Sequence, residues 1–381
     1  MDQSLDRLNH TQADRRSFFY RCHIDAPLLC GLIALMLLSL FVLWSASGQD
    51  PDMLMRKCLH TAAAVVTMIT VAQIPPKYFI KVSVYAYVVG IVLLVMVELF
   101  GDISKGAQRW LNLGFIRVQP SEIFKVVMPL TIAAFLSRAP LPPRTLNTVL
   151  AFAILGAPTA LILMQPDLGT AGLVAVSGFI AIFIAGLSWW WIILGMLLAA
   201  AALPVMWNFV LHDYQKQRVL TLLDPSSDPL GAGYHIIQSK IAIGSGGIYG
   251  KGFLQGSQSQ LDFLPEPHTD FIFAVLSEET GLIGFTILMG LYAVILWRCI
   301  VITLHSSENF NRILTGAFTF TFMFYIFVNI GMVSGILPVV GVPLPFVSYG
   351  GTAMITLSIS FGIIMSLHTH KKVKIFDDKR N

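Results

Sequence analysis

A segment rich in acidic residues stands directly before an apolar stretch in the second half of the chain. Residues 263–270 contain Glu266, His268 and Asp270 together with two prolines. The prolines exclude a helix there, and the apolar residues from Phe271 onward begin one. Asp270 therefore lies at or just inside a helix N-terminus, where the helix dipole favours an ionised carboxylate. Such a group suits a metal ligand or a charge stabiliser, or a base if it is desolvated; helix capping is the alternative interpretation.

A second charged pair occurs at the start of another apolar stretch. Pro120 suits the beginning of a helix, Glu122 lies in its first turn, and Lys125 lies three residues further on. Residues at this spacing share a helix face and can form an ion pair, which is the simpler interpretation. A lysine inside a membrane span costs about 2.5–3.5 kcal/mol unless it faces water or a partner. We therefore expect Lys125 to line a polar cavity.

Two further polar sites lie between apolar stretches. Arg109 precedes Trp110, and this pair is either an anchor at the level of the lipid headgroups or a clamp on a pyrophosphate. Asp167 is predicted to cap the helix that follows it, with lining of the same cavity as the alternative. Glu278 and Glu279 lie deeper in the stretch after Asp270, so we expect both to be hydrogen-bonded and at least one to face Lys125 or another polar partner.

Helices must position these residues, and the composition indicates that the helices cross a membrane. Hydrophobic residues make up 55% of the 381 residues and charged residues 12%, whereas soluble domains carry roughly 25% charged residues. A hydrocarbon core of ~30 Å takes about 20 helical residues. The predicted fold is an all-α polytopic membrane protein, a single domain over residues 1–381, with about ten spans. The spans are 27–46, 57–74, 79–99, 120–137, 146–164, 168–186, 190–210, 271–297, 313–334 and 348–367.

Basic residues set the expected orientation. Nine Lys and Arg lie in one alternate set of connecting segments and fifteen in the other set, which includes both ends of the chain. The more basic set is expected in the cytoplasm. We predict cytoplasmic tails at 1–25 and 368–381, and a long periplasmic loop at 211–270 between the seventh and eighth spans. Membrane lipids are the expected surroundings, and a net charge of +4 does not indicate a nucleic-acid partner.

The loops contain three further patterns. Apolar residues at 236, 237, 241 and 243 predict a short amphipathic helix on the bilayer surface. Six glycines from Gly244 to Gly256 are interpreted as a flexible loop, with anion binding by backbone N–H groups as the alternative. Residues 329–351 are apolar but contain three prolines, so they must line protein or a cavity, as the rim of a lipid entry groove would.

Five segments, in order, resemble the SEDS family (shape, elongation, division and sporulation), and the resemblance runs from Trp44 to His370. Within the family, residues 213–218 and 233–238 are more similar to the members that act in cell elongation and rod shape than to the division members. The five segments are 103–110, 165–170, 228–240, 265–271 and 341–345.

The resemblance implies a peptidoglycan glycosyltransferase in the bacterial inner membrane. It would polymerise lipid II at the periplasmic face, release undecaprenyl pyrophosphate, and work with a class B penicillin-binding protein in the cell-wall elongation complex. The family's essential aspartate falls on Asp270, and its cavity pair on Glu122 and Lys125. Glu266, His268 and Arg109 complete the predicted substrate-binding set, and Asp270 is the predicted ligand of a divalent cation, Mg²⁺ or Mn²⁺.

Two other functions fit the same residues. A lipid II flippase would use the cavity for transport and would need matching sites on both membrane faces. A scaffold that only recruits the penicillin-binding protein leaves the energetic cost of Lys125 unexplained. The charged groups outside the tails gather on one face, which favours the enzyme.

Overall fold

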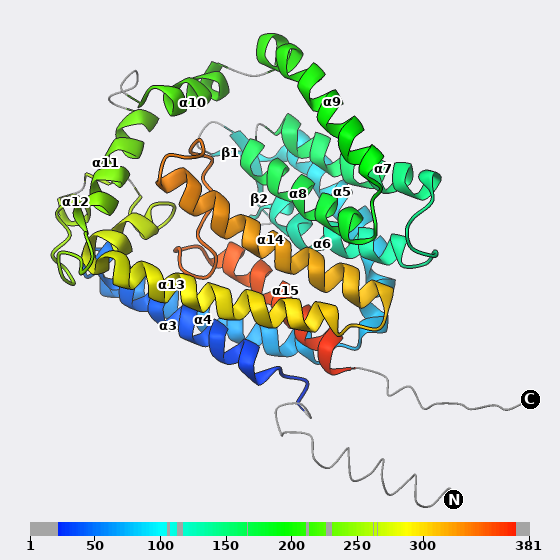
Figure 1. Ribbon diagram of the computed structural model, residues 1–381, viewed down its shortest axis with the longest axis horizontal. Coiled ribbons are helices and arrows are strands. Elements are labelled where there is room, and N and C mark those ends of the chain that lie inside the picture. The colour runs from blue at the N-terminus through cyan, green and yellow to red at the C-terminus, as the bar shows by residue number, and fades with distance from the viewer. Residues whose placement is uncertain are drawn as a thin grey trace, which may run out of the picture.

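The computed structural model describes residues 22–104, 107–112, 117–165, 167–210, 213–225, 231–261, 263–264 and 266–370. Most of the two predicted tails therefore lies outside the described residues. Figure 1 shows a bundle of long helices, with α9, α10 and α11 at its margin.

Ten long helices of the described chain cover the ten predicted spans. Eight are long and apolar enough to cross a membrane, if α9 is counted together with the π-helical turn η1 (Met206–Val210). The other two, α6 and α8, have 17 residues each, at the short end of the range for a spanning helix. The predicted all-helical polytopic membrane fold is confirmed. The ten are α3 (Ala26–Ala46), α4 (Pro51–Ala72), α5 (Pro76–Phe100), α6 (Pro120–Leu136), α7 (Thr145–Met164), α8 (Leu168–Ile184), α9 (Trp189–Val205), α13 (Ile272–Leu304), α14 (Asn309–Val333) and α15 (Gly351–Thr369).

Two helix boundaries differ by six or seven residues from the sequence prediction. α4 begins at Pro51 rather than at 57, because Asp50 caps two backbone N–H groups and proline fits the first helical position. α13 continues to Leu304 rather than ending at 297. Arg298 does not end it, since the guanidinium is paired with Asp25 of α3.

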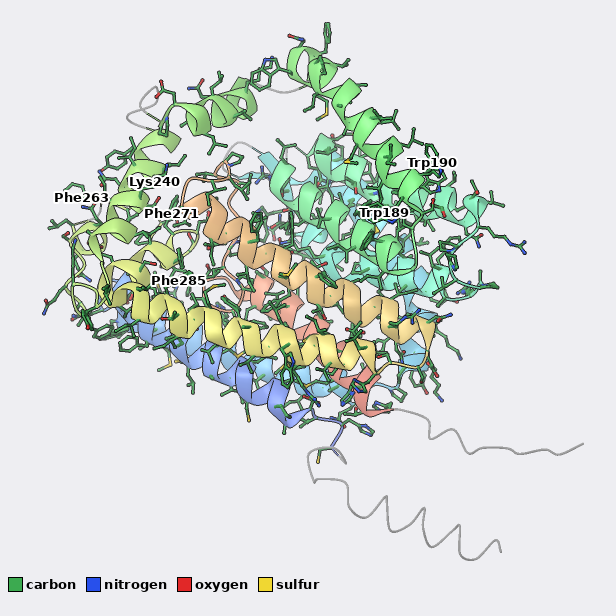
Figure 2. All side chains as sticks on the ribbon, in the orientation of Figure 1. Trp189, Trp190, Lys240, Phe263, Phe271 and Phe285 are labelled. Atoms are coloured by element: carbon green, nitrogen blue, oxygen red, sulfur yellow. The ribbon has the colours of Figure 1, made fainter. Side chains whose placement is uncertain are left out.

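The bundle has a buried centre and an exposed margin. Fourteen of the 17 residues of α6 are buried, as expected for a helix that is apolar on nearly all sides. Gly178 lets α8 approach α6 closely, because a Cβ there would lie 2.8 Å from Met128. By contrast α9 buries no residue. Figure 2 shows its Trp189 and Trp190 far from the start of α13, which Phe271 marks.

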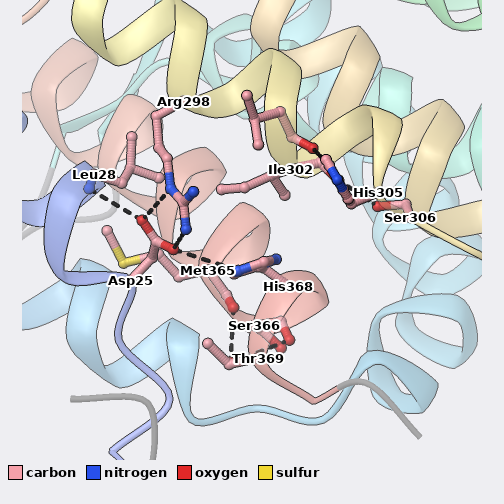
Figure 3. A network of polar contacts seen from close by, with 11 residues as sticks. Asp25, Leu28, Arg298, Ile302, His305, Ser306, Met365, Ser366, His368 and Thr369 are labelled. Carbon is pink, nitrogen blue, oxygen red and sulfur yellow. Dashed lines mark hydrogen bonds and ion pairs between the residues drawn. The ribbon is translucent and has the colours of Figure 1, made fainter. Parts of the chain in front are cut away.

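The two described ends of the chain meet at one end of the bundle. Asp25 accepts hydrogen bonds from Arg298, at 3.0 Å from Nε and 2.6 Å from Nη2. His368 of α15 lies 3.5 Å from the same carboxylate, and Figure 3 shows this network joining α3, α13 and α15. The two described ends therefore lie on one side of the bundle, as an even number of spans requires.

A small antiparallel sheet, which the sequence did not predict, connects α5 to α6. Its strands β1 (Asp102–Ser104), β2 (Ala107–Asn112) and β3 (Arg117–Val118) pair in that order. Trp110 lies opposite Asp102, and Leu111 opposite Val118. Strands of two to six residues carry too little periodicity to be recognised in a sequence. The sheet holds Arg109 and Trp110 on β2.

The long loop before α13 forms three helices in its described part: α10 (Asp213–Leu223), α11 (Ala232–Ser245) and α12 (Ser257–Gln260). α11 confirms the helix predicted around 236–243. It packs on the end of α14, where Ser239 Oγ donates to the carbonyl of Val333 at 2.7 Å. The ring of His235 lies 6.3 Å from that of Phe271, so α11 also reaches the start of α13.

The glycine-rich segment after α11 packs against a break in α13 and forms hydrogen bonds with the backbone there. At the break Gly281 has φ 62° and ψ −151°. The prediction that these glycines form a flexible loop is wrong. The segment packs tightly against α13, because a Cβ at Gly250 would stand 2.0 Å from the carbonyl oxygen of Glu279. Four backbone hydrogen bonds cross between segment and helix, from Lys251 to Glu278, Gly252 to Glu279, Leu282 to Gly247 and Ile283 to Ile248.

The two buried acids at this break are hydrogen-bonded, as expected, but not to Lys125. Glu278 is fully buried and pairs with Lys251 at 2.6 Å. Its carboxylate also accepts from the backbone N–H of Gln258 at 3.0 Å. Glu279 accepts from the hydroxyl of Ser45. These contacts tie the loop before α13 to that helix, and α13 to α3.

Candidate functional site

A polar cavity of about 340 Å³ lies at the end of the bundle away from Asp25. Strand β2, the starts of α6 and α8, the turn before α13, and segment 340–343 line it. Residues 348 and 349 contact the turn of Asp270, and from Gly351 to His368 α15 rises roughly 25 Å at 1.5 Å per residue, so the cavity and the Asp25 network occupy opposite ends. Six charged or amide side chains line the cavity: Arg109, Gln119, Glu122, Lys125, Asp167 and Asp270.

Lys125 faces this cavity and is paired. Its Nζ lies 2.5 Å from Oε1 of Glu122, and the two side chains are only 9% and 12% exposed. The ammonium also lies 5.5 Å from the centre of the Tyr325 ring, a favourable cation–π arrangement. The predicted ion pair and the predicted cavity position of Lys125 are both confirmed.

Arg109 meets Asp167 across the cavity wall. The Nε of Arg109 lies 3.7 Å from Oδ2 of Asp167, and Gln119 donates to the same oxygen at 3.3 Å. The other oxygen accepts from the backbone N–H of Thr170 at 3.2 Å and so caps α8. Asp167 therefore fulfils both interpretations of the sequence, as a helix cap and as a cavity residue.

Asp270 lies in the turn before α13, so it is not the N-cap residue itself. The N-cap residue is Phe271, which makes no side-chain capping bond. The carboxylate lines the cavity beside Gly341, where a Cβ would lie 3.5 Å from Oδ2. Asp270 thus shares one cavity with Lys125 and Arg109.

The backbone that carries Asp270 is held at three successive carbonyl oxygens. Asn329 Nδ2 donates to the carbonyl of Asp270 at 3.1 Å and also to that of Val342 at 2.7 Å. Ser348 Oγ donates to Thr269 at 2.6 Å, and the N–H of Tyr349 donates to His268 at 2.9 Å. Segment 342–349, predicted as a cavity rim, therefore positions the turn of Asp270.

Lys57 holds this rim in place, and the sequence reasoning missed it. Its side chain is fully buried in α4, and Nζ donates to the carbonyls of Phe346, Val347 and Ser348 at 3.3, 3.2 and 2.8 Å. The signal was present, because Lys57 stands in an apolar helix just as Lys125 does. Asn329 carried no such signal, since a lone asparagine in an apolar helix does not reveal its partner.

The other two predicted binding residues lie beside the cavity lining rather than in it. His268 Nε2 is 3.6 Å from Oε2 of Glu266, and the Glu266 side chain is 52% exposed. Neither residue belongs to the lining of the cavity. Of the predicted set, the structure brings Arg109, Glu122 and Lys125 together with Asp270.

A divalent cation at Asp270 stays a prediction. In the described part of the chain, no three His, Cys, Asp or Glu side chains gather into a metal-binding group. Mg²⁺ is usually held by one or two carboxylates together with substrate phosphates and water. Asp270, at the cavity surface, fits such a shared site better than a metal cage built from protein alone.

The fold and the cavity together define a class: multi-pass helical membrane proteins with a charged cavity at one end of the bundle. The chain belongs to the SEDS family, whose FtsW/RodA/SpoVE profile, described as "Cell cycle protein", matches residues 21–373. The resemblance inferred from the five segments is thereby confirmed.

Individual relatives agree with this assignment. The peptidoglycan glycosyltransferase MrdB of Escherichia coli K12 is 54% identical over 360 residues, covering 94% of this chain and 97% of MrdB. The probable peptidoglycan glycosyltransferase FtsW of Coxiella burnetii is 32% identical, covering 90% and 95%.

Two solved structures have the same fold. One, from work on the structural coordination of polymerization and crosslinking by a peptidoglycan synthase complex, superimposes with a TM-score of 0.79 at 28% identity, covering 91% of this chain and 99% of its own. The rod shape determining protein RodA of Thermus thermophilus gives 0.68 at 26% identity, covering 90% and 96%.

Proposed function

We propose that this chain is a peptidoglycan glycosyltransferase of cell elongation that polymerises lipid II at the periplasmic face of the bacterial inner membrane. The activity is supported by 54% identity to MrdB over almost the whole chain. The observation that carries the assignment of the site is the single cavity that holds Asp270, Lys125 and Arg109 together. The flippase and scaffold functions remain the alternatives.

In the proposed reaction, the carbon-4 hydroxyl of an acceptor lipid II attacks the anomeric carbon of the lipid-linked MurNAc of the growing chain. A new C–O bond forms with inversion from α to β, and the bond to the pyrophosphate oxygen breaks. The hydroxyl proton passes to a base, and undecaprenyl pyrophosphate leaves with the bonding electrons. Negative charge develops on that leaving group, so preorganised cations lower the barrier most. Lys125 and Arg109 are the cations of this chain that would do so.

The charge of the cavity supports the predicted cation. Two formal positive charges, Lys125 and Arg109, are each paired with a carboxylate, and Asp270 adds a third negative charge. A pyrophosphate brought into this site adds further negative charge. Mg²⁺ or Mn²⁺ bound between Asp270 and the pyrophosphate would supply the missing positive charge. Asp270 would then act as a metal ligand; as a proton acceptor it would instead take the proton of the attacking hydroxyl.

The proposed partner is a class B penicillin-binding protein within the elongation complex. The structural neighbour from a peptidoglycan synthase complex, in which polymerization and crosslinking are coordinated, supports such a pairing. The assigned membrane side follows from the distribution of Lys and Arg.

The purified full chain, supplied with labelled lipid II and Mg²⁺, Mn²⁺ or a chelator, tests the proposal. Asp270→Asn and Asp270→Ala should abolish glycan synthesis without changing expression or thermal stability. Asp52→Asn, an exposed carboxylate in the first turn of α4, serves as the control and should behave like wild type. Unchanged glycan synthesis in the Asp270 variants would refute the assignment, and transbilayer movement of lipid II without polymer would favour the flippase.

A further inference from the structure

A second cavity, apolar throughout, adjoins the polar one. It has a volume of about 240 Å³ and lies between α8 and α14, which Figure 1 shows side by side. All eleven lining residues are glycine or apolar. From Leu168 to Val176 its α8 wall extends roughly 12 Å along the helix at 1.5 Å per residue. We call it the α8–α14 groove.

The groove and the polar cavity share a wall. Five residues line both spaces, namely Leu168, Gly169, Leu173, Val340 and Val342. Leu173 and Val342 are 4% and 2% exposed. Only this wall separates an apolar space from a cavity lined by Arg109 and Lys125, and this adjacency matches a molecule with a charged group at the end of an apolar chain.

The wall shared by the two cavities is tightly packed, whereas the α8–α14 groove is open at Gly172. At Gly169 an added Cβ would lie 2.8 Å from the carbonyl oxygen of Val340, so α8 and the rim are in tight backbone contact. At Gly172, one turn further on, an added Cβ meets nothing within 4 Å. Gly172 is exposed, while Leu173 beside it is buried. The groove is thus a preformed slot rather than a gap that side chains fill.

We propose that the α8–α14 groove binds the polyprenyl chain of the lipid-linked substrate, with its first isoprene units next to the pyrophosphate. This inference rests on the proposed function. A polyprenyl pyrophosphate carries concentrated negative charge at the end of a single chain, which matches one narrow apolar slot beside paired cations. A phospholipid has two chains, so it matches this single slot less well.

Photocrosslinking tests this placement without requiring catalysis. Undecaprenyl pyrophosphate with a diazirine on an early isoprene unit is added to the purified full chain, and labelled peptides are mapped. Labels should fall on α8 and α14 around Gly172, Phe324 and Val328. Labels on other helices would overturn the proposal. So would equal labelling of the groove by a diazirine phospholipid that undecaprenyl pyrophosphate does not displace.

A single substitution can block the groove without disturbing packing. Gly172→Leu places its side chain in open space, and Gly156→Leu on α7 is the matched control, because a Cβ there also meets nothing within 4 Å. Gly172→Leu should lose the crosslink in the groove. The KM for undecaprenyl-linked substrate, divided by the KM for a short-chain substrate, should rise about tenfold, because methylene groups of the polyprenyl chain are no longer buried there. Gly156→Leu should leave label and ratio unchanged.

The two proposals fail in different ways. If wild-type protein makes no glycan from lipid II, the proposed function is wrong, whatever the crosslinks show. If wild type makes glycan and Gly172→Leu matches Gly156→Leu in both label and KM ratio, the groove assignment alone is wrong. Tm measurements on both variants identify a folding defect, and in that case the map of labels on wild type decides.

Discussion

Two buried lysines in apolar helices serve different purposes in this protein. Lys57 donates to three backbone carbonyls and so holds the rim beside the site. Lys125 pairs with Glu122 and faces the cavity. Both lie in long helices of the bundle, and only the three-dimensional partners distinguish a lysine that supports the backbone from one that faces the cavity.

The Glu122–Lys125 pair predicts a specific pattern of stability. Glu122→Gln should lower the free energy of unfolding by about 3 kcal/mol, because Lys125 is left without its counter-ion in a largely buried place. The double variant Glu122→Gln/Lys125→Met should recover part of this loss, since no unpaired charge remains. Thermal unfolding in detergent measures both. Equal losses in the single and double variants would show that the two side chains are not coupled.

At the scale of elements, α13 depends on a segment that precedes its break at Gly281 by about thirty residues. Its own helical hydrogen bonding is interrupted at Gly281, and residues 247–252 supply the missing partners. The buried Glu278–Lys251 pair reinforces the same junction. The helix that follows Asp270 is therefore a composite of a span and a piece of the outer loop.

Gly281→Ala should disrupt the contact between α13 and residues 247–252. Alanine is strained at φ 62° and ψ −151°, and its Cβ would stand 2.4 Å from the backbone nitrogen of Gly250. We expect a marked fall in Tm and faster proteolysis within the loop. Gly290→Ala, in the same helix with no atom within 4 Å of the new Cβ, should instead raise stability by up to about 1 kcal/mol. Similar behaviour of the two variants would contradict the composite helix.

The sequence predicted the elements better than their junctions. Apolar stretches located all ten long helices, and the spacing of Glu122 and Lys125 predicted both their pairing and their cavity. The break at Gly281 could not be predicted, because a glycine in an apolar span looks the same whether it packs or kinks. The position of Asn329 beside Asp270 depends on residues 59 apart in the chain, a contact that no local pattern records.

At the scale of the whole molecule, the two ends of the bundle are built differently. At one end the Asp25 network joins the start of α3 to the ends of α13 and α15, through an ion pair with Arg298 and a contact with His368 (Figure 3). At the other end the charged side chains also form ion pairs, but these pairs line a cavity. One end thus fixes the helices, and the other leaves room for a ligand.

A double-mutant cycle on Asp25 and Arg298 tests this division. Each of Asp25→Asn and Arg298→Gln should lower Tm, and their coupling should be about 1–3 kcal/mol, because the carboxylate is nearly fully buried and the contact is bidentate. The KM for lipid II should not change, since the network lies roughly 25 Å from the cavity along α15. A coupling near zero, or a changed KM with unchanged Tm, would contradict a purely structural role.

At Gly281, hydrogen bonds to residues 247–252 replace those within the helix. This replacement also affects how the protein is inserted into the membrane. Backbone groups left without partners in lipid cost several kcal/mol each. α13 therefore cannot insert stably into the bilayer by itself. Residues 247–252 precede this part of α13 in the chain, so they are synthesised first. Placing the loop against the helix and inserting the helix are therefore coupled steps in biogenesis, and a delay in the first would hold back the second.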